Sequence, residues 1–98
     1  MAKDAAEAAP NVYTVLFENE RVRLLEARIK PGDSSAMHAH PNYLVYSPVD
    51  SKVTFTEASG QSIDVDLKAK QAMWREAEEH SAKNNGSADI VALLFELK

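Results

Sequence analysis

The chain has 98 residues and a mass of 10.8 kDa, the size of one small domain. Hydrophobic residues make up 45% and charged residues 27%, proportions that are typical of a folded globular protein and not of a disordered one. The net charge of -4 argues against nucleic acid as a partner, because affinity for phosphates depends on an excess of lysine and arginine.

The first eleven residues are rich in alanine and include Pro10. Their composition leaves two structures open, a flexible tail or a short helix. We predict a flexible N-terminal tail over residues 1–11 and a single folded domain over residues 12–98.

Two strands are predicted next, over residues 12–17 and 21–30, because both segments are rich in apolar and β-branched residues. The second places Leu24 beside Leu25, which breaks the alternation of apolar and polar residues. This break indicates either a β-bulge or a strand that is buried on both faces. A turn follows at Gly32, since glycine accepts the positive φ that such turns need.

The rest of the chain consists of short strands separated by turns. Ser59 and Gly60 are predicted to close a hairpin, and the dipeptide of Asn85 and Gly86 is typical of a two-residue hairpin turn. Asn84 is expected to cap that turn. The final segment is almost entirely apolar and is therefore expected at the centre of a sheet. The predicted strands cover residues 42–46, 52–57, 61–67 and 71–76, a segment near His80, and residues 90–97. This pattern predicts an all-β sandwich or barrel.

Several classes of protein are excluded by what the sequence lacks. Cysteine is absent, which excludes disulfides, thiolate catalysis and zinc sites built on cysteine. Apolar runs are far shorter than the roughly 18–20 residues of a membrane-spanning helix. The first ten residues have no apolar core of the kind that signal peptides need. We therefore expect a cytoplasmic protein without a membrane partner.

The three histidines are the candidate functional residues. His38 and His40 are two positions apart, so on a strand their rings point to the same face. Imidazole is the commonest metal ligand, and His80 on a later strand would complete a set of three nitrogens if the sheet closes. The alternative is that the first two histidines lie in a loop and are simply solvated.

Two spacings frame these histidines. Gly32 precedes His38 and His40 in the pattern Gly-(x5)-His-x-His, and Asn84 follows His80 in the pattern His-(x3)-Asn. This combination resembles the two motifs of the cupin family, whose members place metal ligands inside small β-barrels. The resemblance implies an all-β, jelly-roll-like antiparallel cupin barrel in a single domain, with a metal bound by the three histidines.

The chain departs from the cupin pattern at several positions. The first motif normally ends in a glutamate, and here Leu44 and Val45 occupy the two places where it would fall. Ala69, Arg75 and Ala77 replace the glycine, proline and glycine of the second motif. The resemblance therefore implies a neutral site of three histidines. The missing glutamate and the end of the chain are also weakly similar to the small cupins of β-alanine degradation.

The resemblance also implies a cofactor and partners. The cofactor would be a divalent transition metal such as zinc, iron, nickel or manganese, and imidazole ligands suit zinc, iron, nickel and copper alike. The ligand would be a small organic molecule, which we expect to be anionic because no ligand carboxylate offsets the metal's charge. A homodimer is expected from the family. The sequence leaves open whether the protein is an enzyme of the dioxygenase or isomerase type or a non-catalytic binding or sensing module.

The positions of further residues along the predicted strands suggest what these residues contact. Tyr46, Trp74 and Leu44 are predicted to contact the substrate, Tyr46 because it has the same parity as the histidine pair. The alternative for these side chains is packing in the core. Glu78 and Glu79 are expected to form a solvated charge run, and the alternative is that one of them replaces the missing glutamate.

Overall fold

The computed structural model describes residues 2–98, and over these residues strands dominate. Every strand except the short one at residues 38–40 falls within a few residues of a segment that the sequence pattern predicts. The helix and strands are α1 (Ala5–Ala8), β1 (Tyr13–Glu18), β2 (Val22–Ile29), β3 (His38–His40), β4 (Tyr43–Ser47), β5 (Ser51–Glu57), β6 (Ser62–Leu67), β7 (Gln71–Arg75), β8 (Glu78–Lys83) and β9 (Ile90–Leu97).

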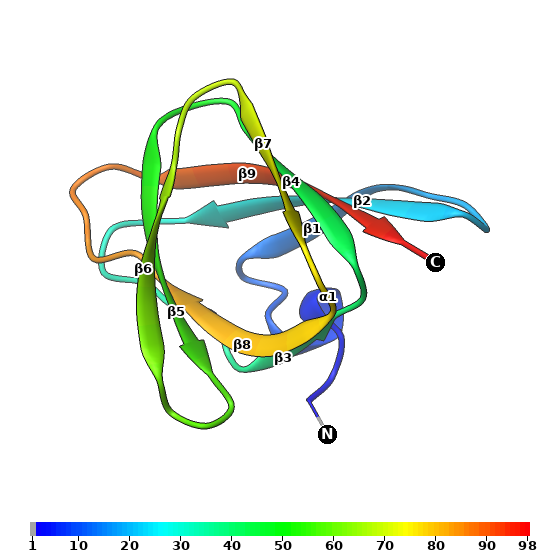
Figure 1. Ribbon diagram of the computed structural model, residues 1–98, viewed down its shortest axis with the longest axis horizontal. Coiled ribbons are helices and arrows are strands. Elements are labelled where there is room, and N and C mark those ends of the chain that lie inside the picture. The colour runs from blue at the N-terminus through cyan, green and yellow to red at the C-terminus, as the bar shows by residue number, and fades with distance from the viewer. Residues whose placement is uncertain (1) are drawn as a thin grey trace.

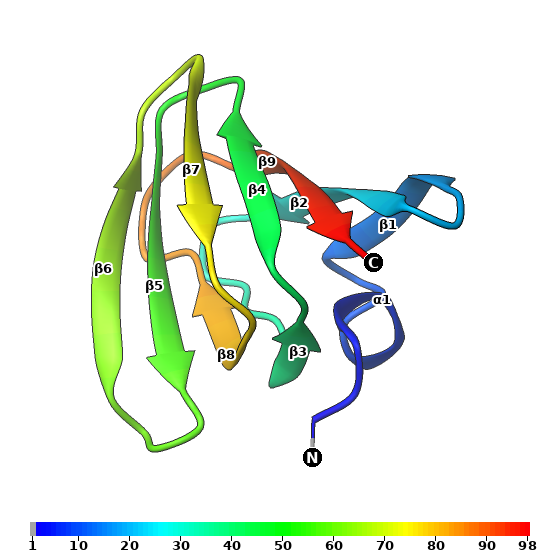
Figure 2. The same ribbon diagram turned by 45° about the vertical axis from the view of Figure 1, so that its right-hand side comes forward.

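The strands form two sheets that face each other (Figures 1 and 2). One sheet has the order β1-β2-β9-β4-β7 and the other the order β3-β8-β5-β6, and neighbouring strands are antiparallel. The chain crosses repeatedly from one sheet to the other, as in a jelly roll. The all-β, jelly-roll-like prediction is confirmed, although the two sheets are not closed into a barrel by continuous hydrogen bonding.

The last strand has the central position that its apolar sequence predicts. β9 pairs with β2 along its full length and with β4 on its other side. Ala92 and Leu94 point into the space between the sheets and are almost fully buried. Residues of the two neighbouring strands, β2 and β4, lie beside them on the same face of the sheet. Leu25 and Val45 are examples, and both belong to the core. The core therefore lies between the two sheets.

The predicted irregularity in the second strand is a β-bulge, and it lies in the partner strand. Val15 pairs with Leu25 and Phe17 pairs with Leu24, so that Leu16 is the extra residue of β1. The bulge lets the two adjacent leucines of β2 keep their alternation, with Leu25 buried and Leu24 on the outer face.

The turns at Gly32 and Gly60 are confirmed, since both residues have positive φ, 85° and 95°. The hairpin predicted at Asn85 and Gly86 is wrong. Gly86 does not have a positive φ, and the strands on either side of it, β8 and β9, belong to different sheets. The buried amide of Asn84 shapes this connection instead: it donates to the carbonyls of Ile29 and Ala88 and accepts from the Gly86 N–H.

A short helix lies within the first eleven residues. The Asp4 side chain caps it by accepting from the Ala6 N–H at 3.1 Å, and Ala5 and Ala9 are fully buried in the core. Of the two structures that the composition left open, the structure therefore shows the helix, packed beside β1 and β3 (Figure 2). The division of the chain after residue 11 stays a prediction. Among residues 2–98, no helix is long and apolar enough to cross a membrane.

Candidate metal centre

The three histidines meet inside the fold. His38 and His40 lie on β3 and His80 lies on β8, directly opposite His38 in the strand register. The pairing of these two strands fixes all three rings on the inner face, and each residue is at most 4% exposed. One nitrogen from each ring lies within 4.8 Å of the others. The grouping predicted from the sequence is confirmed.

The surroundings of His38 fix the direction of its ring. Nδ1 lies 2.8 Å from the Ala36 carbonyl, which accepts hydrogen bonds only, so the proton is on Nδ1. Nε2 then carries the lone pair, and it accepts from the Tyr13 hydroxyl at 3.0 Å. The Tyr13 ring packs edge-on against His38 with its centroid 4.9 Å away.

The other two rings each face a carboxylate. Nδ1 of His40 lies 2.7 Å from Oε2 of Glu96, and Nδ1 of His80 lies 3.4 Å from Oε1 of Glu78. The His80 ring also stacks on Phe55, with centroids 4.5 Å apart. In all three histidines, then, Nδ1 faces an oxygen acceptor. Over the residues that the structure describes, Nε2 is unpaired in His40 and His80, and in His38 it accepts from Tyr13.

Some ring nitrogens of these histidines have no hydrogen-bond partner in the described part of the chain and are available to bind a metal. Among residues 2–98, Nε2 of His40 and both ring nitrogens of His80 are buried without a hydrogen-bond partner. A buried polar atom without a partner costs roughly 1–3 kcal/mol, so its presence needs an explanation. Three imidazoles whose Nδ1 atoms face acceptors are the usual ligand set of a divalent metal. The residues therefore fit the metal that the sequence pattern implies.

Burial of the His38 and His80 imidazoles favours their neutral form. It lowers the pKa of His38 from 6.5 to about 4, although the hydrogen bond to the Ala36 carbonyl opposes the shift. Burial also lowers the pKa of His80, against the opposing effect of the Glu78 carboxylate. Both rings are thus neutral at pH 7, the state in which imidazole binds a metal.

In the metal-free protein, acidification is expected to weaken the fold. The unfolded chain binds a proton at His38 near pH 6.5 and the folded chain only near pH 4, so stability falls as the pH drops through this interval. From His38 we expect a loss on the order of 2 kcal/mol between about pH 7.5 and about pH 5. Urea unfolding of chelator-treated protein measures it. The variant His38→Gln, which does not titrate, should show a smaller difference, and an equal difference would contradict the assignment.

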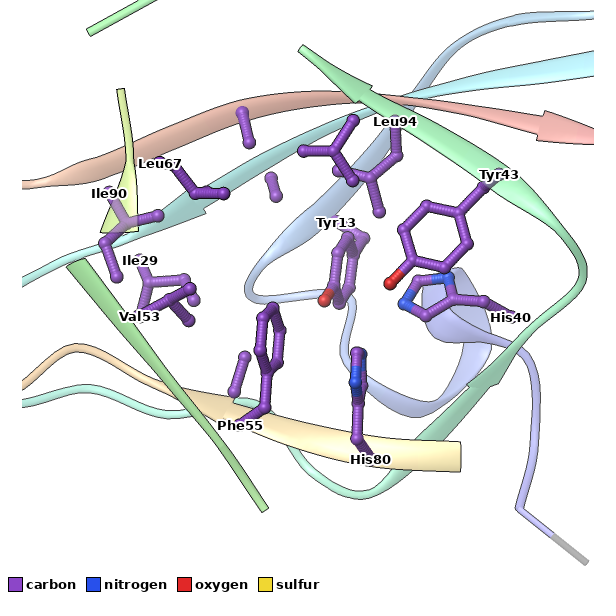
Figure 3. A pocket seen from close by; sticks show the side chains of 14 residues that line it. Tyr13, Ile29, His40, Tyr43, Val53, Phe55, Leu67, His80, Ile90 and Leu94 are labelled. Carbon is purple, nitrogen blue, oxygen red and sulfur yellow. The ribbon is translucent and has the colours of Figure 1, made fainter. Parts of the chain in front are cut away.

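The space beside the histidines is small and apolar. A cavity of about 30 Å³ lies between the sheets, enough for one or two water molecules. Figure 3 shows the side chains of His40, His80, Tyr13 and Tyr43 gathered at one end of it. The Tyr43 hydroxyl donates to Glu78 at 2.5 Å. The remaining lining residues are Ala27, Ile29, Val45, Val53, Phe55, Leu67, Ala82, Ile90, Ala92 and Leu94.

The residues predicted to contact the substrate do not line this cavity. Leu44 pairs with Trp74 on the outer face of the five-stranded sheet, where they are 38% and 48% exposed, and Tyr46 points to the same side. Tyr46 does not share the inward side of His38 and His40, because Pro41 lies between β3 and β4, which belong to different sheets, and the alternation starts again at Tyr43. Tyr43 is the tyrosine that faces inward, and it is 1% exposed.

Several residues that contact the histidines were not predicted from the sequence. Glu96 is 2% exposed and contacts His40, and its signal is a lone acid at a buried position of the apolar run of β9. Tyr13 carries no such signal. Glu78 is not solvated as predicted, because its carboxylate accepts hydrogen bonds from Arg75 and Tyr43. Glu79 is half-buried and accepts from the Ala2 N–H at 3.2 Å.

Solved structures match the chain closely. A cupin domain from Bordetella pertussis Tohama I matches with a TM-score of 0.81 and 27% sequence identity, covering 100% of this chain and 98% of that one. A Klebsiella pneumoniae protein with a double-stranded β-helix domain matches with a TM-score of 0.69 and 19% identity, covering 88% and 75% of the two chains. A predicted oxalate decarboxylase from Thermotoga maritima matches with a TM-score of 0.57 and 22% identity, covering 88% and 79%.

The last two likenesses concern the fold alone. No protein-family model and no curated protein sequence matches the chain. The whole-length match to the Bordetella pertussis domain agrees with the two histidine motifs and with the inward position of all three histidines. The chain is therefore a member of the cupin superfamily.

Proposed function

We propose that this protein binds a divalent transition metal through His38, His40 and His80, and a small anion at that metal. The observation that supports it best is the set of buried imidazole nitrogens that have no hydrogen-bond partner among residues 2–98. A metal so held would act as a Lewis acid on an oxygen ligand. The protein contributes the apolar cavity, the three imidazoles and the acceptors that orient them.

The charges around the site favour an anion. Position 44 faces outward, and position 45 faces the cavity but carries a valine, so neither supplies a carboxylate ligand. The two nearby carboxylates are each already paired with an arginine, Glu96 with Arg23 and Glu78 with Arg75. The protein would thus offset little of the metal's charge. An uncompensated charge in an apolar interior is unfavourable, and an anionic ligand reduces this cost more than a neutral ligand does.

The size of the cavity limits the ligand. About 30 Å³ suits a hydroxide or a formate, and a larger carboxylate such as acetate or oxalate would require side chains to move. Elemental analysis of protein purified without a histidine tag tests the metal. Oxygen uptake in the presence of carboxylates and diketones distinguishes an oxygenase from a non-catalytic binding module.

Val45→Glu is expected to strengthen metal binding and weaken anion binding together, because the new carboxylate supplies the charge that the anion otherwise brings. Calorimetric titration of the metal-loaded protein with acetate and oxalate measures the effect. Leu44→Glu is the matched control, since its side chain lies outside the cavity and should change neither affinity. If the parent protein binds these anions no better than Val45→Glu does, the charge argument is wrong.

A further inference from the structure

We propose that Glu96, Arg23 and Asp4 form a relay that orients the His40 imidazole, so that the N-terminal segment takes part in the metal centre. The cupin motifs that frame the histidines contain none of these three residues. The inference rests on the proposed metal binding, but the relay itself is visible in the protein's own contacts.

The first contact of the relay joins Glu96 to His40. Oε2 of the carboxylate lies 2.7 Å from Nδ1, and the two side chains are 3% and 0% exposed. A carboxylate only accepts hydrogen bonds, so this contact keeps the proton on Nδ1 and the lone pair on Nε2. Nε2 is the buried nitrogen without a partner. Glu96 therefore decides which nitrogen of His40 is offered to the metal.

The second contact fixes the carboxylate itself. Nε and Nη2 of Arg23 lie 2.9 and 2.6 Å from Oε1 of Glu96. One oxygen is thus occupied by the guanidinium and the other by the imidazole. Because the guanidinium is planar and has its donors in fixed positions, it prevents the carboxylate from turning away. It also supplies the charge that lets a carboxylate remain buried.

The third contact brings in the N-terminal segment. Nη2 of Arg23 also lies 2.8 Å from Oδ1 of Asp4, the residue that caps α1. One residue earlier, the Lys3 carbonyl accepts from the Ala39 N–H at 2.8 Å, and Ala39 lies between the two histidines of β3. Both figures show α1 beside β3 (Figures 1 and 2). The segment before β1 therefore holds both the ligand strand and the arginine of the relay.

The test compares Glu96→Gln, Asp4→Asn and the parent protein at full length. In Glu96→Gln, the amide oxygen is expected to stay with the two donors of Arg23, which turns the NH₂ group toward Nδ1 of His40. That nitrogen then accepts, and the ring proton moves to Nε2. Imidazole ¹⁵N–¹H correlation spectra of the metal-free proteins should show this change of tautomer, which a merely structural role would not produce.

Metal affinity is the second readout. Titration of Co²⁺ against a competing chelator should give a dissociation constant about 10–100-fold larger for Glu96→Gln than for the parent. Asp4→Asn should weaken binding by a smaller factor, because it acts on His40 through two intermediate residues. Glu18→Gln is the control, since it removes an exposed ion pair with Lys98 and should change neither readout.

The relay and the metal site can fail separately. If Glu96→Gln retains both the parent tautomer and the parent affinity for Co²⁺, the relay is wrong. If the parent itself does not bind Co²⁺, the proposed function is wrong, and the tautomer of His40 in the metal-free proteins still decides whether the relay exists.

Discussion

Replacing His80 with alanine is expected to reduce the metal content of the purified protein from about one ion per chain to nearly none. His80 is the one ligand from β8, and it lies opposite His38 across the pair of strands. Without it, the remaining two histidines come from a single strand of three residues and offer only two of the three ligands. Elemental analysis after dialysis measures the loss.

The control for this experiment lies on the same strand. Ser81→Ala changes the next residue, whose side chain points away from the histidines, and should leave the metal content unchanged. Circular dichroism should show the same all-β spectrum in both variants, because β8 keeps its pairing with β3 and β5. Full metal occupancy in His80→Ala would mean that the three histidines do not form one site.

Replacing Arg23 with methionine is expected to cost about 3–5 kcal/mol of folding free energy. Arg23 makes two hydrogen bonds to a carboxylate whose side chain is 3% exposed. Removing the guanidinium leaves the carboxylate of Glu96 buried without the arginine that pairs with it. The total free energy of unfolding of a small domain is only about 5–15 kcal/mol, and the midpoint of thermal unfolding should fall by about 15–25 °C.

Arg28→Met is the matched control for this loss. Arg28 is on the same strand, but its side chain is 50% exposed and its contacts with Glu26 and Asp89 are long, 3.9 and 3.6 Å. Exposed pairs of this kind contribute about 0–1 kcal/mol. Urea unfolding of both variants measures the difference. If the two replacements cost the same, the contact between Arg23 and Glu96 does not stabilise the fold as its burial implies.

The sequence by itself determined the strands, the fold class and the three candidate ligands. Alternation and turn residues are local signals, and they placed every strand except β3 within a few residues of its position. The apolar run of residues 90–97 predicted the central strand β9, because only a strand with neighbours on both sides and a covered face buries so many apolar residues. The spacing of His38 and His40 put both rings on one face for the same local reason.

The position of Tyr46 shows where local reasoning failed. Its parity with the histidines was counted through Pro41, and parity has no meaning across a break between strands of different sheets. The turn at Gly86 failed similarly. Asn-Gly favours a tight hairpin. The hydrogen bonds from the buried Asn84 amide to the carbonyls of Ile29 and Ala88 outweigh that preference.

Only the tertiary structure decided the surroundings of the ligands. Tyr13 meets His38 across 25 positions of sequence, and Glu96 meets His40 across 56. Asp4 reaches the same network through Arg23, 19 positions away. Each contact depends on which strands become neighbours, and sequence periodicity does not specify this, because it records which face of a strand is buried but not which side chain lies opposite.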